Sequence, residues 1–144
     1  MTSPLTMTKA VREEFLAALH VGVLAIDGEG DDPPLAAPVW YRYEPGGDVL
    51  INTGADSVKA RLLAGAGRAS FCVQREDLPY AFVTVEGPVT VGPADEAEHE
   101  RIAVRYLGDL AGAYLSSTAD VAQVLVRLTP ERWRTQDYSH MTLG

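Results

Sequence analysis

Strand-like segments joined by short turns occupy most of this 144-residue chain. Residues 35–43 alternate between two sets of side chains, the period of a strand with two different faces, and Pro38 marks an edge or a bulge. Gly87 and Pro88 predict a bend in the longest segment. Because turns of hairpin length connect most of the segments, they favour an antiparallel barrel over a parallel sheet. The six expected strands cover residues 21–27, 35–43, 49–53, 68–74, 81–91 and 121–129.

Helix signals interrupt the strands at a few places. Thr8 and either Asp56 or Ser57 are candidate N-caps, because their side-chain oxygens can accept from the free backbone N–H groups of a first turn. Gly108 is a candidate stop. Residues 135–144 form a polar tail to which no structure is assigned. The expected helices cover residues 9–19, the segment from the second cap to about residue 64, residues 95–107 and, as a short second helix, residues 109–119.

Composition and charge exclude several classes of protein. Hydrophobic residues make up 47% of the chain and no linker divides it, so we expect one domain over residues 1–144. The formal net charge of −8 disfavours binding to nucleic acid. No apolar run approaches the roughly 20 residues that span a bilayer, and the N-terminus lacks a signal-peptide pattern. We therefore expect a cytoplasmic protein with no membrane association.

The usual catalytic and metal-binding patterns are missing from the sequence. His20, His99 and His140 are widely spaced, so no metal site is expected. Cys72 is the only cysteine and lies in an apolar strand, which favours a buried structural thiol over a nucleophile. No Gly-x-Ser-x-Gly sequence occurs. The residues alone identify no catalytic acid, base or nucleophile.

Residues 52–62 combine a strand end, a short loop and the first turn of a helix. Free backbone N–H groups and the helix dipole favour an anion there, and Thr53 and Ser57 can add hydroxyl donors. Lys59 and Arg61 add two cations, and Lys59 is one of only two lysines in the chain. An ammonium beside a guanidinium suits a phosphate. The alternative, an ordinary solvated helix face, stays open.

Several short motifs occur in an order that resembles a known family. They are Pro38-Val-Trp40, a strand ending in Thr53, Ser57-x-Lys59-x-Arg61, Arg68-x-Ser-x-x-Val73, Pro79-Tyr80 and Val85-x-Gly87. Over roughly residues 15–110 this ordered set resembles the pyridoxamine 5'-phosphate oxidase-like split barrels, in particular the actinobacterial flavin and deazaflavin oxidoreductases. The resemblance implies a mainly β fold with flanking helices, a six-stranded antiparallel split barrel of the FMN-binding type. It also implies a homodimer with two cofactor sites at the subunit interface.

The resemblance also implies which residues bind the cofactor. Its phosphate end coincides with the anion segment described above, through Thr53, Ser57, Lys59 and Arg61. Its isoalloxazine or deazaflavin ring would lie against the neighbouring strand, at Pro38, Val39 and Trp40. For Trp40, a core or dimer-interface aromatic is the alternative.

More distant residues complete the implied site. Gln74 and Arg75 would reach the ring edge or an anionic tail of the cofactor, although solvated surface is the alternative for Arg75. Trp133, with Arg134 and His140, occupies the region from which relatives send groups into the partner's site. These assignments rest on the resemblance alone.

Two functions from different classes follow. The first is an oxidoreductase that uses the deazaflavin coenzyme F-420 or FMN to transfer a hydride to or from a small conjugated or heteroaromatic substrate. The second is a non-catalytic protein of the same fold that binds or carries a flavin, heme or another tetrapyrrole. In the first, the cofactor carries the redox chemistry and the protein supplies orientation and exclusion of water, so no conspicuous catalytic acid or base is needed.

Overall fold

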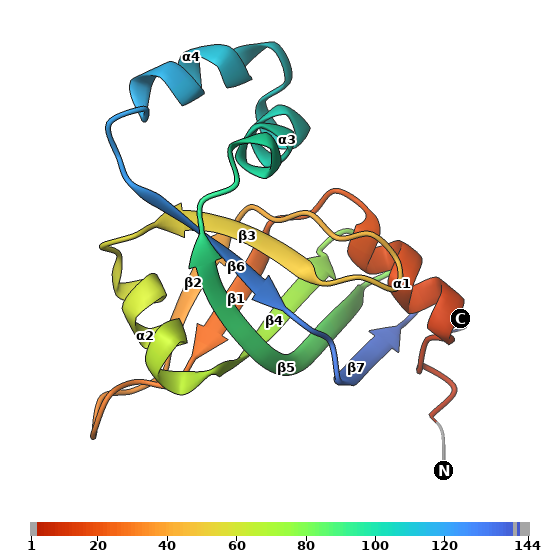
Figure 1. Ribbon diagram of the computed structural model, residues 1–144. Helices are drawn as coiled ribbons and strands as arrows, with labels where there is room; N and C mark the ends of the chain where they lie inside the picture. The colour runs from red at the N-terminus through yellow and green to blue at the C-terminus, as the bar shows by residue number, and fades with distance from the viewer. Residues whose placement is uncertain (1–2, 140, 142–144) are drawn as a thin grey trace.

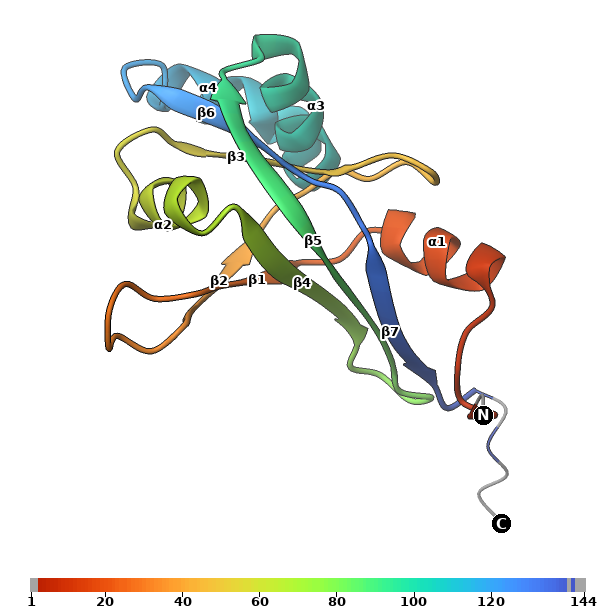
Figure 2. The ribbon, with the colours of Figure 1, turned by 60° about the horizontal axis from the view of Figure 1, so that its bottom comes forward.

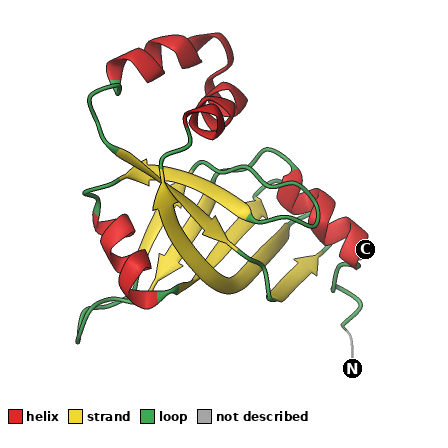
Figure 3. Ribbon diagram, viewed as in Figure 1, coloured by secondary structure: helices red, strands yellow, loops and turns green. Residues whose placement is uncertain are grey.

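An antiparallel barrel makes up most of the computed structural model, which describes residues 3–139 and 141 (Figure 1). Within these residues the strands are β1 (Gly22–Ile26), β2 (Leu35–Val39), β3 (Val49–Gly54), β4 (Arg68–Arg75), β5 (Ala81–Pro93), β6 (Gln123–Leu128) and β7 (Arg132–Asp137). The helices are α1 (Lys9–Ala17), α2 (Val58–Ala66), α3 (Glu96–Leu107), the 3-10 turn η1 (Gly108–Leu110) and α4 (Ala111–Ser117). Figure 3 shows that the helices lie around the strands rather than among them.

The sheet closes on itself. Hydrogen-bonded neighbours follow the order β2-β1-β4-β5-β6-β3, and each pair is antiparallel. Beyond the end of β2, Arg42 and Leu50 exchange two backbone hydrogen bonds of 3.0 and 2.9 Å, which link the chain after β2 to β3. This contact joins the two ends of the sheet (Figures 1 and 2). The predicted mainly β split barrel is confirmed, and all six expected strands are present.

The sequence did not predict β7, which adds a seventh strand in the described part of the chain. Residues 81–86 of β5 pair with β4 on one edge and with β7 on the other, and residues 89–93 pair with β6. Most side chains of β7 are polar, so no alternating pattern marks it in the sequence. Its strand conformation comes from the backbone ladder with β5 and from Trp133, which packs against the core.

Gly87 lies where the segment between β6 and β7 passes β5. The pairing register with β5 shifts by one residue between the two strands, so this segment is a bulge. A Cβ on Gly87 would lie 1.8 Å from the carbonyl oxygen of Thr129. That oxygen belongs to a backbone held in the ladder, since the Thr129 N–H donates to the Pro88 carbonyl at 3.0 Å. The close crossing therefore requires glycine.

Replacing Gly87 with alanine should lower the free energy of unfolding by about 1–3 kcal/mol, the usual cost of forcing an extra methyl group into a packed region. Gly65 provides the control, because it lies in α2 and a Cβ there would meet nothing within 4 Å. Gly65→Ala should raise the free energy of unfolding by about 0.5–1 kcal/mol through better helix propensity. Urea unfolding of both variants measures the difference. Equal stability of Gly87→Ala and wild type would contradict the crowded crossing.

Large apolar side chains fill the barrel. Gly22 leaves room for the ring of Phe71, because a Cβ there would lie 2.0 Å from the Phe71 Cζ. Leu16 attaches α1 to this core, and the Tyr41 hydroxyl donates to its carbonyl at 2.6 Å. Burial raises the pKa of Tyr41 well above its ordinary value. The largest fully buried side chains are those of Leu16, Leu24, Ile26, Tyr41, Ile51, Leu63, Phe71 and Leu128.

The chain between β5 and β6 forms α3, η1 and α4, which pack together outside the barrel (Figures 1 and 2). α3 contacts β3, so the helical pair lies over the end of the barrel where β3 leads into α2. Asp95 caps α3 by accepting from the Glu98 N–H at 3.0 Å. The two helices therefore form a wall opposite the strand–loop–helix segment that the sequence predicts to bind an anion.

Candidate functional site

A pocket of about 400 Å³ lies between the barrel and this helical wall. Its volume is within the range of about 300–1,000 Å³ that is typical of small-molecule sites. The segments after α1 and at the end of β2, the end of β3 and the start of α2 form one side, and α3 and α4 form the other. Its lining residues are Val21, Pro38, Val39, Trp40, Asn52, Thr53, Lys59, His99, Ile102, Ala103 and Tyr114.

Five of the residues predicted to bind the cofactor line this one pocket. Three come from the end of β2 and the residue after it, one from β3 and one from α2. The barrel therefore brings the strand predicted to contact the ring next to the segment predicted to bind the phosphate. These five residues are Pro38, Val39, Trp40, Thr53 and Lys59.

The start of α2 forms the polar end of the pocket. Ser57, one of the two predicted caps, is the N-cap, and its Oγ accepts from the Ala60 N–H at 3.1 Å. The Oγ atoms of Thr53 and Ser57 lie 3.4 Å apart. No ion pair or hydrogen bond within the described chain engages the Lys59 ammonium. Lys59 thus presents an uncompensated positive charge to the pocket.

The structure separates Lys59 from Arg61, which the sequence predicts to act together. Arg61 does not line the pocket. Its guanidinium lies on Glu29 in the turn between β1 and β2, with an Nε–Oε1 distance of 3.1 Å. Residues two positions apart on a helix point to different sides, which is why the two cations diverge. Lys59 is therefore the cation that lines this pocket, and a phosphate contact from Arg61 stays a prediction.

Aromatic side chains form the opposite wall. The Trp40 ring stacks on Tyr106 at a centroid distance of 5.1 Å and an angle of 7°, and it lies 5.7 Å from the ring of Tyr114. The Tyr106 hydroxyl donates to the His20 carbonyl at 2.6 Å and accepts from the Tyr41 N–H at 3.1 Å. Trp40 thus packs against α3 and also lines the pocket. It therefore has features of both sequence-based interpretations, a packed aromatic and a residue that can contact a ligand ring.

Two of the other predicted residues, Gln74 and Arg75, lie outside this pocket at the far end of β4. The Arg75 Nε donates to the Pro79 carbonyl at 2.7 Å, and the Tyr80 hydroxyl donates to the Gln74 Oε1 at 3.3 Å. Both residues thus engage the turn that follows β4. Their roles at a cofactor stay predictions.

The residues expected to cross a dimer interface lie on β7. The Trp133 ring packs under the Arg12 guanidinium at 4.6 Å, and the Arg134 Nε donates to Glu86 at 2.8 Å. His140 lies outside the described residues. Trp133 does not line the pocket of its own chain, so its predicted role still requires a second subunit.

Sequence reasoning missed the side of the pocket that α3 and α4 provide. Asn52 lies in the predicted anion segment but was not selected, and His99 was considered only as a metal ligand. The sequence did predict a helix over residues 95–107, the segment that contains His99, Ile102 and Ala103. Nothing in the spacing showed that it folds back over the end of β3. The missed lining residues are Val21, Asn52, His99, Ile102, Ala103 and Tyr114.

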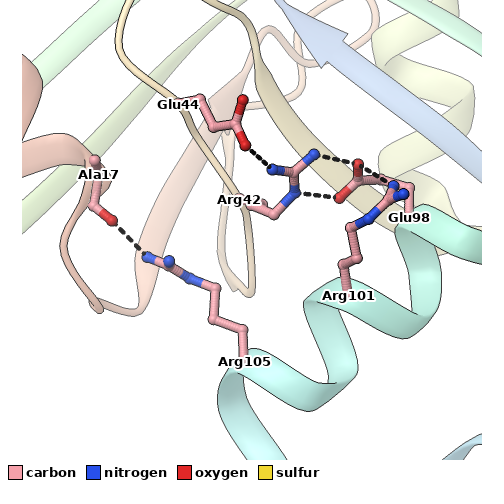
Figure 4. A network of polar contacts seen from close by, with 6 residues as sticks. All are labelled: Ala17, Arg42, Glu44, Glu98, Arg101 and Arg105. Atoms are coloured by element: carbon pink, nitrogen blue, oxygen red, sulfur yellow. Dashed lines mark hydrogen bonds and ion pairs between the residues drawn. The ribbon is translucent and has the colours of Figure 1, made fainter.

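A buried ion pair attaches α3 to the barrel (Figure 4). Both terminal oxygens of Glu98 accept from Arg42, through Nε and Nη2, at 2.6 Å. The Glu98 side chain is 4% exposed, and that of Arg42 is 23% exposed. Hydrogen bonds from Arg42 hold the pKa of Glu98 below its ordinary value of 4.5 despite burial. About two turns further along α3, Arg105 donates to the carbonyls of Ala17 and Ala18 at 3.0 and 2.8 Å.

None of the helices in the described residues combines the length and apolar character required to cross a bilayer. Nor do three of the described His, Cys, Asp or Glu side chains gather in one place as metal ligands would.

Comparisons with known proteins agree with this architecture. The sequence matches the family model for pyridoxamine 5'-phosphate oxidase over residues 7–137. The crystal structure of the conserved hypothetical protein Rv2991 from Mycobacterium tuberculosis is similar, with a TM-score of 0.78 and 26% identity over 99% of this chain and 96% of that one.

Two more distant structures share the fold. One is described as an F420 reductase, with a TM-score of 0.67 and 20% identity over 85% of this chain and 94% of that one. The other is an FAD-binding protein from Mesorhizobium loti, with a TM-score of 0.64 and 20% identity over 91% and 93%. A comparison with the curated proteins finds no match. Because the family model matches nearly the whole chain, this chain belongs to the pyridoxamine 5'-phosphate oxidase family.

Proposed function

We propose that this chain is an oxidoreductase that uses coenzyme F-420 or FMN to transfer a hydride to or from a small conjugated or heteroaromatic substrate. The observation that supports it best is a pocket with an aromatic wall at Trp40 and an uncompensated cation at Lys59. A flat ring joined to a phosphate has the same two chemical parts. Membership of a family with flavin-binding and deazaflavin-binding relatives supports the same proposal.

The residues present fit such a cofactor. Lys59 and the Thr53 hydroxyl would hold the phosphate, and Pro38, Val39 and Trp40 would hold the ring. When bound, the ring supplies the hydride chemistry. The chain itself binds and orients both reactants, and Ile102 on α3 helps to exclude water from the reacting atoms.

A second copy of the chain would complete the site. Pro38, Val23 and Cys72 are neighbours across β2, β1 and β4, and the pleat places them on the outer face of the barrel. Val21 and Val23 are 55% and 41% exposed there. Val21 and Pro38 also line the pocket, so this apolar surface continues into it. We infer that a homodimer covers this face and shares the cofactor sites.

The second candidate function is a carrier of the same fold that binds a flavin, heme or another tetrapyrrole without turnover. A neighbour of the same fold that is described only as an FAD-binding protein favours this alternative. Mixing the purified protein with reduced F-420 or reduced FMN and an acceptor separates the two. An oxidoreductase reoxidises the cofactor faster than buffer does, whereas a carrier binds the cofactor without acceleration.

A further inference from the structure

A histidine on α3 faces the candidate pocket. His99 lines it together with Ile102 and Ala103, which lie one turn later on the same helix. Its ring is edge-on to Tyr114, at a centroid distance of 6.1 Å and an angle of 84°. No hydrogen bond or ion pair within residues 3–139 engages its ring nitrogens. Both ring nitrogens are therefore available to form hydrogen bonds with a ligand.

His99 also borders a second cavity of about 400 Å³ between α3, α4 and the start of β6. Asn52 and His99 line both cavities, so they form the boundary between them. The Asn52 Nδ2 donates to the Gln123 Oε1 at 2.7 Å, whereas its Oδ1 is buried without a hydrogen-bond partner. A ligand that fills the first cavity and reaches this boundary meets an unengaged imidazole and an unpaired amide oxygen.

The position of His99 is fixed by contacts on either side of it. Its backbone N–H donates to the Asp95 carbonyl at 2.9 Å, and the preceding residue, Glu98, holds the two 2.6 Å hydrogen bonds from Arg42. Further along α3, Tyr106 is held by hydrogen bonds to the His20 carbonyl and the Tyr41 backbone. α3 therefore presents His99 to the pocket from a rigid support, as precise positioning of a polar contact requires.

We propose that His99 contacts the substrate, and that the substrate is a small conjugated carbonyl compound whose oxygen accepts a hydrogen bond from the imidazole. The proposal rests on the proposed function, with reduced F-420 or FMN as the reductant. The β carbon of the substrate gains the hydride, the C=C electron pair moves toward the carbonyl, and negative charge gathers on its oxygen. The imidazole N–H stabilises that charge. The α carbon then takes a proton from water, which leaves the saturated carbonyl compound.

The first test compares wild type with His99→Ala and His99→Gln, using 2-cyclohexen-1-one as the acceptor. Val104→Ala is the control, because Val104 lies on the same helix, is 49% exposed and does not line either cavity. All four proteins should bind the cofactor with affinities within threefold of one another. In His99→Ala, kcat/KM for 2-cyclohexen-1-one should fall about 100-fold, as when one oxyanion donor is lost. His99→Gln, which keeps an N–H donor, should recover part of the kcat/KM that is lost in His99→Ala.

A second readout does not depend on turnover. In wild type loaded with oxidised cofactor, the side-chain ¹⁵N signals of His99, assigned by their loss in His99→Gln, should shift when 2-cyclohexen-1-one is added. Unshifted signals, or a wild-type kcat/KM in His99→Ala, would overturn the proposal. A tenfold loss of cofactor affinity in His99→Ala would also overturn it, because His99 would then be a cofactor contact. A wild type that binds neither cofactor refutes the proposed function itself, and the His99 proposal with it.

Discussion

Replacing Arg42 with methionine should lower the free energy of unfolding by about 3 kcal/mol, one of the largest effects expected for a single substitution in this chain. Glu98 would keep its buried position, with only 4% of its side chain exposed, but would lose two hydrogen bonds of 2.6 Å. Removing one partner of a buried ion pair costs about 3–5 kcal/mol. Because Arg42 is partly exposed, we expect a cost at the lower end of this range. Urea unfolding at pH 7 measures the loss.

Two further variants show whether the stability lost in Arg42→Met comes from burying an unpaired charge or from lost packing. Arg101 also approaches Glu98, at 3.4 Å, but its side chain is 56% exposed, so Arg101→Ala should cost less than about 1 kcal/mol. The double variant Arg42→Met, Glu98→Leu removes both charges and should regain most of the stability lost in the single variant. If Arg42→Met were as stable as wild type, or the double variant no better than the single one, α3 would not depend on this ion pair.

Replacing Lys59 with alanine should weaken binding of FMN or F-420 about 10–100-fold. The proposed charge-assisted hydrogen bond to a phosphate contributes about 1.5–3 kcal/mol, and each 1.4 kcal/mol is a factor of ten in affinity. The cofactor-free protein should keep its stability within about 0.5 kcal/mol, because no described partner of the Lys59 ammonium is lost. Isothermal titration at matched salt measures the affinity.

Arg61→Ala is the matched control, two residues away on the same helix. Its guanidinium lies on Glu29 and outside the pocket, so its loss should change the affinity less than threefold. Equal losses of cofactor affinity in Lys59→Ala and Arg61→Ala would support the paired-cation site predicted from the sequence. No loss in either variant would refute the phosphate end of the pocket.

The sequence predicted the barrel because its strands have either an alternating pattern or a dense apolar composition. β7 was missed for the opposite reason: its polar side chains carry no signal, and the β5 ladder decides its conformation. Likewise, local spacing identified Ser57 as a potential cap and Lys59 as a potential ligand. These features depend only on residues within a few positions of one another.

The rest of the pocket depends on long-range packing, which a single sequence does not display. His99 and Tyr114 reach the pocket only because α3 folds back over β3, and the Arg42–Glu98 ion pair that holds it joins residues 56 positions apart. Arg61 is a residue that the sequence did select but that does not line the pocket. Its guanidinium suits a phosphate, but the direction of its side chain depends on its position around the helix and on Glu29, which lies 32 positions away.

In native mass spectrometry of the purified protein, alone and after incubation with FMN or F-420 at micromolar concentration, we expect a dimer of about 31 kDa, twice the chain mass of 15.5 kDa. The dimer should carry two molecules of one of these cofactors. Lys59→Ala should stay dimeric but carry less of the cofactor, whereas Arg61→Ala should retain it. A 15.5 kDa monomer that carries neither cofactor under any of these conditions would contradict the shared cofactor site.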